Sequence, residues 1–243
     1  MSIARWWWRW AAGAVALAGV AAIALMPTKT TQGIDYDVVT HRMRLYEKGL
    51  DFLQRDSSYA RLVAEIVPAE APPEATALAL FDWTRQNVRD QPSGFPVIDD
   101  HVSHIIIRGY GVADQKADVF TTLATYAGVP AYWTRIGERP HVVLSLAWID
   151  RRWRVFDVEN GIVFRTSAGA LAAVDDLAAD PALTKSVAAD RIYHARPYVS
   201  YFAGFLPPVA PDLLRAEQQM LWPRAMYNTM RLIGLGRREW QLQ

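Results

Sequence analysis

Apolar residues recur at intervals of three and four along several stretches of the chain, which is the spacing of helices that bury one face. Turn-forming residues bound these stretches: Pro72 and Pro73 precede one of them, and Gly128 and Pro130 follow another. Pro223 predicts a kink or a restart inside the last stretch. The predicted helices cover about 39–53, 59–66, 74–89, 113–127, 168–179 and 212–233.

Between residues 130 and 165 the pattern changes to an alternation with period two, which is typical of strands. This alternation predicts strands over 132–136, 141–149 and 152–158, with a short fourth strand over 162–164. A tight turn at Asp150 and Arg151 joins the second strand to the third. We therefore expect these two strands to form an antiparallel hairpin.

The N-terminus holds an uncharged run from Ala11 to Met26 that follows a cluster of tryptophans and two arginines, Arg5 and Arg9. With the tryptophans the run reaches the roughly 20 residues that a helix needs to cross a bilayer. The arginine flank predicts a single-pass anchor with a cytoplasmic N-terminus and a periplasmic main domain. Two alternatives remain open: a signal peptide cleaved at Ala22-Ile23-Ala24, and a buried core helix.

The composition excludes several classes of function. Lys and Arg total 26 against 25 for Asp and Glu, and a net charge of +1 argues against a nucleic-acid partner. The chain contains no cysteine, which excludes disulfides, thiolate metal sites and a native thiol nucleophile. His101 and His104 are close in sequence, but no third ligand is assured, so we expect neither a metal nor a cofactor.

Changes in pattern along the chain predict four parts. Residues 1–27 are the expected cytoplasmic end and anchor, 28–73 a helical spacer, 74–165 the core, and 166–243 a helical and aromatic extension. The extension contains an amphipathic, slightly basic segment, which suits a bilayer surface or an integral membrane partner. The alternative is that it packs on its own domain. The predicted contact face consists of Trp222, Met226, Met230 and Ile233.

The residues that suggest chemistry lie between 108 and 158. A glycine-rich turn over 108–112 leads into the helix predicted to begin near Ala113, where the helix dipole stabilises an anion. His141 opens a strand, and Asp157 lies near the end of the next one. The hairpin turn puts position 143 or 144 opposite 157, so His141 and Asp157 are within reach of one another. A histidine held by a carboxylate is the base half of a catalytic triad.

These motifs, in this order, resemble the transglutaminase-like superfamily over about residues 74–165. The matching residues are Trp83 and Asn87, Gly111-Val112-Ala113-Asp114, Gly128-Val129-Pro130-Ala131, His141 with Trp148, and Trp153 followed by Asp157. The resemblance implies an α+β fold with a papain-like core, in which a helix packs on an antiparallel sheet. It also implies a nucleophilic cysteine at position 113, with His141 and Asp157 as its partners.

Position 113 is alanine in this chain, and a methyl group cannot attack a carbonyl carbon. The leading hypothesis is a membrane-anchored, catalytically degenerate protein that acts as a binding or accessory subunit of a membrane-associated complex. A protein or peptide would then occupy the inactive cleft. The alternative is a Cys→Ala form of an active cysteine acyl-transferase or protease. A third reading gives His141 and Asp157 a role in stability alone.

Other polar residues near this stretch receive simpler interpretations. Neither of two nearby serines is expected to replace the nucleophile, since Ser103 lies ten residues upstream of position 113 and Ser145 lies in the middle of the strand that bears His141. Lys116 and Asp118, which follow Ala113 on the same helix, are interpreted as a solvated face. Tyr110 is expected to flank the site where an oxyanion would form, on the basis of its position alone.

Overall fold

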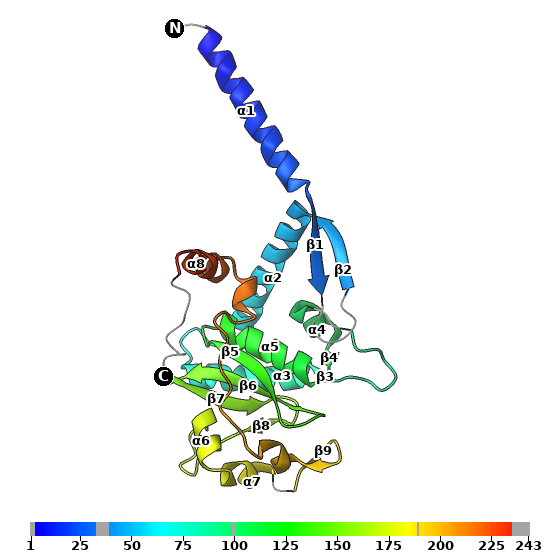
Figure 1. Ribbon diagram of the computed structural model, residues 1–243, viewed down its shortest axis with the longest axis vertical. Coiled ribbons are helices and arrows are strands. Elements are labelled where there is room, and N and C mark those ends of the chain that lie inside the picture. Colours follow the sequence, from blue (N-terminus) through cyan, green and yellow to red (C-terminus); the bar gives the residue numbers. More distant parts are fainter. Residues whose placement is uncertain (1–2, 33–38, 99–100, 189, 235–243) are drawn as a thin grey trace. The chain divides into compact units, whose positions relative to one another are not determined.

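The structure, a computed structural model, describes residues 3–32, 39–98, 101–188 and 190–234. The chain divides into two compact units (Figure 1). The first unit contains residues 1–57 and 98–101, and the second contains residues 58–97 and 102–243.

The first unit consists of a helix, a two-stranded hairpin and the start of a second helix. Helix α1 is Ile3–Ala24, and strands β1 (Pro27–Gln32) and β2 (Val39–Arg44) pair antiparallel. Helix α2, Leu45–Ile66, follows β2 directly and continues into the second unit. The helix expected over 39–53 therefore begins as a strand, and it joins the one expected over 59–66 into a single helix.

The predicted transmembrane anchor is wrong. Helix α1 is 22 residues long, but half of those residues are alanine or glycine, and Arg5 and Arg9 interrupt its first turns. Among the described residues, no helix combines the length and the apolar character that a bilayer span requires. The predicted single-pass topology and periplasmic placement of the main domain depended on a spanning helix, so neither prediction is supported.

The second unit is built around one antiparallel sheet in the order β5-β6-β7-β8. The strands are β5 (Ala131–Ile136), β6 (Val142–Ile149), β7 (Arg152–Asp157) and β8 (Ile162–Val163), close to the predicted ranges. Asp150 and Arg151 both have positive φ, 51° and 59°, as a two-residue hairpin turn requires. The predicted hairpin is confirmed.

Three helices cover one face of this sheet: α3 (Pro73–Asn87), α4 (Val102–Arg108) and α5 (Ala113–Tyr126). Short strands β3 (Arg89–Asp90) and β4 (Tyr110–Gly111) pair in parallel beside them. Helix α5 lies at the centre, and its residues 115–125 are all buried. The rings of Phe81, Phe120 and Phe156 meet between α3, α5 and the sheet, with centroids 5.2–6.1 Å apart. This contact fixes α5 against β7.

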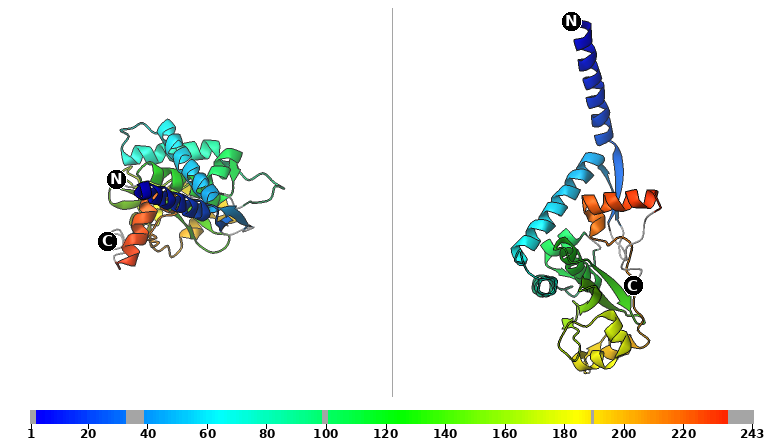
Figure 2. Two further views of the ribbon diagram at one scale, coloured as in Figure 1. Left: turned by 90° about the horizontal axis from the view of Figure 1, so that it is seen from above. Right: turned by 90° about the vertical axis from the view of Figure 1, so that its left-hand side faces the viewer.

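The segment after β8 covers the opposite face of the sheet (Figure 2). It includes α6 (Val174–Ala179), α7 (Ala182–Ala188), β9 (Ile192–Tyr193), β10 (Arg196–Pro197) and the 3₁₀ turn η1 (Tyr198–Phe202). Aromatic residues of η1 pack against Leu144 and Val155 of the sheet in a second hydrophobic core. Much of the expected extension is therefore part of the domain.

The chain ends, within the described residues, in the 3₁₀ turn η2 (Glu217–Gln219) and helix α8 (Leu221–Leu232). Pro223 lies in the first turn of α8, where a proline is tolerated because it has no hydrogen-bonding partner to lose. The helices expected over 168–179 and 212–233 are thus shorter than predicted. The predicted α+β fold, with a helix packed on an antiparallel sheet, is confirmed.

Candidate functional site

Helix α5 begins at Ala113, as the glycine-rich turn predicts. Gln115 shapes this turn, because its Oε1 accepts hydrogen bonds from the backbone N of Val112 (3.3 Å) and from Arg108 Nη2 (2.7 Å). Gly111 leaves room for that side chain, since a Cβ there would lie 2.9 Å from Gln115 Oε1. The first turn of α5 is therefore held firmly, with a methyl group at position 113.

His141 lies just before β6, at the end of the hairpin that joins β5 to β6. Its Nδ1 is 2.7 Å from the carbonyl oxygen of Gly137. Because a carbonyl only accepts, Nδ1 is the donor in this contact. An ion pair between Asp114 and Arg135 (3.0 Å) joins the first turn of α5 to β5, the strand that leads into this hairpin.

Asp157 is held by different partners from those that the triad hypothesis requires. Its carboxylate accepts hydrogen bonds from Asn160 N and Nδ2, both 2.8 Å, and from the Tyr198 hydroxyl at 2.6 Å. No hydrogen bond joins Asp157 to His141, both of which the structure describes. The catalytic roles of His141 and Asp157 stay predictions, but the structure does not assemble them into a dyad.

The register of the hairpin explains the separation. Ser145 pairs with Phe156, which places Leu144 opposite Asp157. Side chains alternate between the two faces of a strand, so Phe156 faces α5 while Asp157 faces the second core, with Leu144. The carboxylate therefore lies on the side of the sheet that α5 does not cover.

Burial dominates the electrostatics around Asp157. It raises the pKa of the Asp157 carboxyl above the ordinary 3.8, while the hydrogen bonds from Asn160 and Tyr198 act in the opposite direction. Burial and the nearby carboxylate also raise the pKa of Tyr198 well above 10.0. The phenol is thus a hydrogen-bond donor at neutral pH, and the two groups form a buried structural contact.

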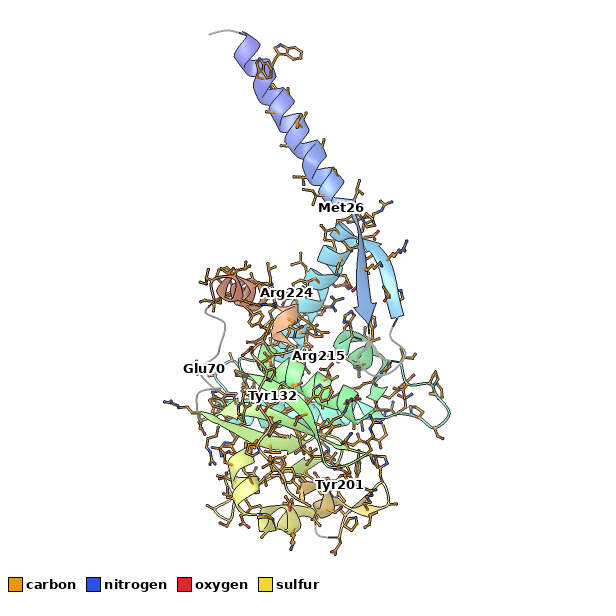
Figure 3. All side chains as sticks on the ribbon, viewed as in Figure 1. Met26, Glu70, Tyr132, Tyr201, Arg215 and Arg224 are labelled. Carbon is orange, nitrogen blue, oxygen red and sulfur yellow. The ribbon has the colours of Figure 1, made fainter. Side chains whose placement is uncertain are left out.

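Lys116 and Asp118 are not a solvated face, and that interpretation is wrong. The Lys116 side chain is 4% exposed and its ammonium contacts the carboxylates of Asp90 and Glu159. The Asp118 carboxylate accepts a hydrogen bond from Trp133 Nε1 (3.1 Å) and pairs with Arg215 (2.9 Å), which the C-terminal segment brings to the site (Figure 3). Helix α5 is enclosed on every side, so its charged residues must find partners within the protein.

The remaining polar candidates do not form a second reactive centre. Ser145 is fully buried in the middle of β6, and the backbone N of Ser103 donates to the Tyr59 hydroxyl. Across the described parts of the chain, His, Asp and Glu side chains nowhere form a group of three suited to a metal ion.

Comparison with known proteins identifies the central part of the chain. Residues 60–158 match the model of the transglutaminase-like superfamily. This region, called the transglutaminase-like core below, is similar to that superfamily. The matched region begins within α2, ends directly after β7 and covers less than half of the chain. The sequence resemblance is confirmed over this region, which includes Ala113, His141 and Asp157.

Two solved structures are similar to part of the chain. A candidate cysteine protease from Cytophaga hutchinsonii is 20% identical with a TM-score of 0.35, over 51% of this chain and 45% of that one. A candidate protease from Parabacteroides distasonis is 13% identical with a TM-score of 0.34, over 42% of this chain and 23% of that one. The chain therefore spans less than half the length of either. No curated protein matches it.

The predicted contact face is exposed. Trp222 is 76%, Met226 51%, Met230 38% and Ile233 62% exposed. The four residues follow the helical spacing along α8 and its C-terminal cap, so they share one side. Other apolar residues of the tail, such as Tyr198 and Phe202, are buried in the second core.

Proposed function

We propose that the transglutaminase-like core is a catalytically degenerate binding module that holds a protein or peptide ligand without transferring its acyl group. The observation that carries this proposal is Ala113, which opens α5 where the family motif has its nucleophilic cysteine. Without a thiolate no acyl-enzyme can form, and loss of a nucleophile lowers rates by several orders of magnitude.

The environment of Asp157 supports this proposal over the alternative of an active enzyme with one altered residue. In a triad, the carboxylate orients the imidazole and stabilises its charged form. Here the Asp157 carboxylate accepts hydrogen bonds from Tyr198 and Asn160, while the Nδ1 of His141 donates to the carbonyl oxygen of Gly137. Two features of the catalytic arrangement, the thiol and the carboxylate–imidazole contact, are therefore missing.

Restoring the thiol tests this proposal directly. We expect Ala113→Cys to leave the incorporation of a fluorescent amine into glutamine-containing casein, and the hydrolysis of casein peptides, within about tenfold of the unmodified chain. Alkylation by iodoacetamide provides the control that the new thiol is accessible. A gain of about a thousandfold or more, abolished by adding His141→Ala, would instead establish the active-enzyme alternative.

We also propose that α8 docks in an apolar groove on a partner protein, which would make the chain an accessory subunit. The four residues of the contact face lie on one side of α8, and Arg224 and Arg231 lie on the other. Both arginines are exposed. An amphipathic helix with apolar anchors on one side and cations on the other is complementary to an apolar groove on a partner, with the cations left in solvent.

Photo-crosslinking distinguishes the two sides of α8. With benzoylphenylalanine at Trp222 we expect one discrete protein adduct in cells, suppressed by a synthetic 217–234 peptide. The same probe at Asn228, on the polar side, is the matched control. Equal adducts at both positions, or adducts with lipid alone, would overturn the proposal.

A further inference from the structure

A cavity of about 480 Å³ lies beside α5, three residues after Ala113 along the helix. It is lined by Arg85, Val88, Arg89, Asp90, Lys116, Val158 and Glu159. Its volume is within the range of sites that bind small ligands. Five of its seven lining residues are ionisable, and Arg85, Arg89 and Asp90 are exposed, so it is a polar pocket that opens to solvent.

The charges around the cavity leave an excess of one positive charge. Lys116 contacts two carboxylates: Glu159 at 2.7 Å and Asp90, whose side chain is 85% exposed. Arg85 and Arg89 line the same cavity, and within the described residues neither guanidinium forms an ion pair. Three cations therefore face two carboxylates. One further carboxylate would neutralise the site, whereas a phosphate dianion would exceed its charge.

Contacts with neighbouring residues fix the position of the Arg85 guanidinium. Its Cζ lies 5.7 Å from the centroid of the Phe81 ring, a cation–π contact. It also packs against Gly161, where an added Cβ would lie 2.3 Å from Arg85 Cζ. Gly161 has φ of +66°, so both the space and the backbone conformation favour glycine there. The guanidinium is thus held in place before any ligand arrives, which reduces the entropy cost of binding.

We propose that this cavity binds a carboxylate group of a peptide ligand, held by Arg85 and Arg89 beside the buried ammonium of Lys116. A planar guanidinium presents two parallel N–H donors to the two oxygens of a carboxylate. The inference rests on the proposed function, since it names the group by which the transglutaminase-like core recognises its peptide. The carboxylate belongs either to an acidic side chain or to a C-terminus.

Four probes, titrated calorimetrically into the full chain, test this site. Acetyl-glutamate amide carries only a side-chain carboxylate, acetyl-glutamine only a terminal one, and acetyl-glutamine amide neither; inorganic phosphate is the fourth probe. We expect saturable binding of at least one carboxylate probe and none of the neutral amide. The carboxylate probe that binds more tightly identifies the source of the group.

Substitutions then assign the binding to the cavity. Arg85→Gln and Arg89→Gln should each weaken binding of that probe by about tenfold or more. Gly161→Ala keeps every charge but displaces the Arg85 guanidinium, and it should weaken binding as well. Arg61→Gln, at an exposed position on α2, is the matched control for loss of one positive charge and should change nothing.

Three results would overturn the inference: no saturable binding of either carboxylate probe, an equal loss in Arg61→Gln, or tighter binding of phosphate than of both carboxylates. These failures are distinct from failure of the proposed function. A chain that binds no probe but stays inert after Ala113→Cys loses only the carboxylate site. A chain that binds a carboxylate probe but transfers acyl groups after Ala113→Cys loses only the proposed function.

Discussion

Arg215→Met should lower the free energy of unfolding by about 3 kcal/mol, because it leaves the Asp118 carboxylate buried without the neutralising guanidinium. The Asp118 side chain is 5% exposed and lies 2.9 Å from Arg215, which is itself 33% exposed. This partial exposure of Arg215 places the expected loss at the low end for a broken buried ion pair. Urea unfolding followed by circular dichroism measures the change.

The double variant Asp118→Asn with Arg215→Met separates charge from packing. An amide carries no charge, so most of the loss should be recovered relative to Arg215→Met alone. If the losses of unfolding free energy from the two single substitutions instead add in the double variant, the contribution of Arg215 comes from its packing against the domain, and the charge argument fails. This contact is important to the architecture because it joins the C-terminal segment to the central helix α5.

Tyr198→Phe should lower the free energy of unfolding by about 2 kcal/mol at neutral pH, since the Asp157 carboxyl loses a buried hydrogen-bond donor. The phenol oxygen is 2.6 Å from the Asp157 carboxylate, and both side chains are fully buried. Tyr201→Phe is the matched control in the same 3₁₀ turn. Its hydroxyl donates to the neutral carbonyl of Tyr193 at 3.2 Å, so its loss should be about 1 kcal/mol or less.

The pH dependence follows from the raised pKa of Asp157. Because it is buried, the Asp157 carboxyl has a higher pKa in the folded state than in the unfolded state, where its pKa is near 3.8. The stability that this proton provides is therefore present below 3.8 and is lost as the pH rises through the folded-state pKa. The loss of unfolding free energy caused by Tyr198→Phe should therefore grow as the pH rises through this range. The loss caused by Tyr201→Phe should stay constant. A penalty for Tyr198→Phe that does not change with pH would mean that Asp157 is not ionised at neutral pH.

Local signals explain the parts of the fold that the sequence predicts well. Gly111 and Gly128 mark the ends of α5, and the positive-φ turn at Asp150 and Arg151 fixes the β6–β7 hairpin. These features depend on a few neighbouring residues, so they can be recognised without knowing the tertiary structure. Helix α4, Val102–Arg108, was missed because it is short and lies within a region rich in turn formers.

The register between β6 and β7 decides which face of the sheet carries the Asp157 side chain. The turn leaves either residue 143 or residue 144 opposite Asp157, and the structure places Leu144 there. With Val143 opposite, Asp157 would have shared the face of the sheet that α5 covers; with Leu144 opposite, it faces the second core. A difference of one residue in register therefore separates a triad partner from a structural carboxylate.

The charges of α5 could not be interpreted from the periodic pattern alone. Lys116 and Asp118 are charged, and charged residues on helices are mostly exposed, yet both are buried. Their partners Asp90, Glu159 and Arg215 are distant in sequence, and only the tertiary fold brings them together. A helix enclosed on all sides has no solvated face to which such residues can be assigned.

The second hydrophobic core determines how short an independently folding fragment of this protein can be. A fragment cut at residue 158, where the family match ends, would lose the aromatic residues of η1 that cover the sheet. One face of the sheet would then be exposed to solvent, including Leu144, Leu146 and Val155. An exposed apolar surface of this kind promotes aggregation. The smallest autonomous unit must therefore continue at least to Leu214, the last residue of this second core.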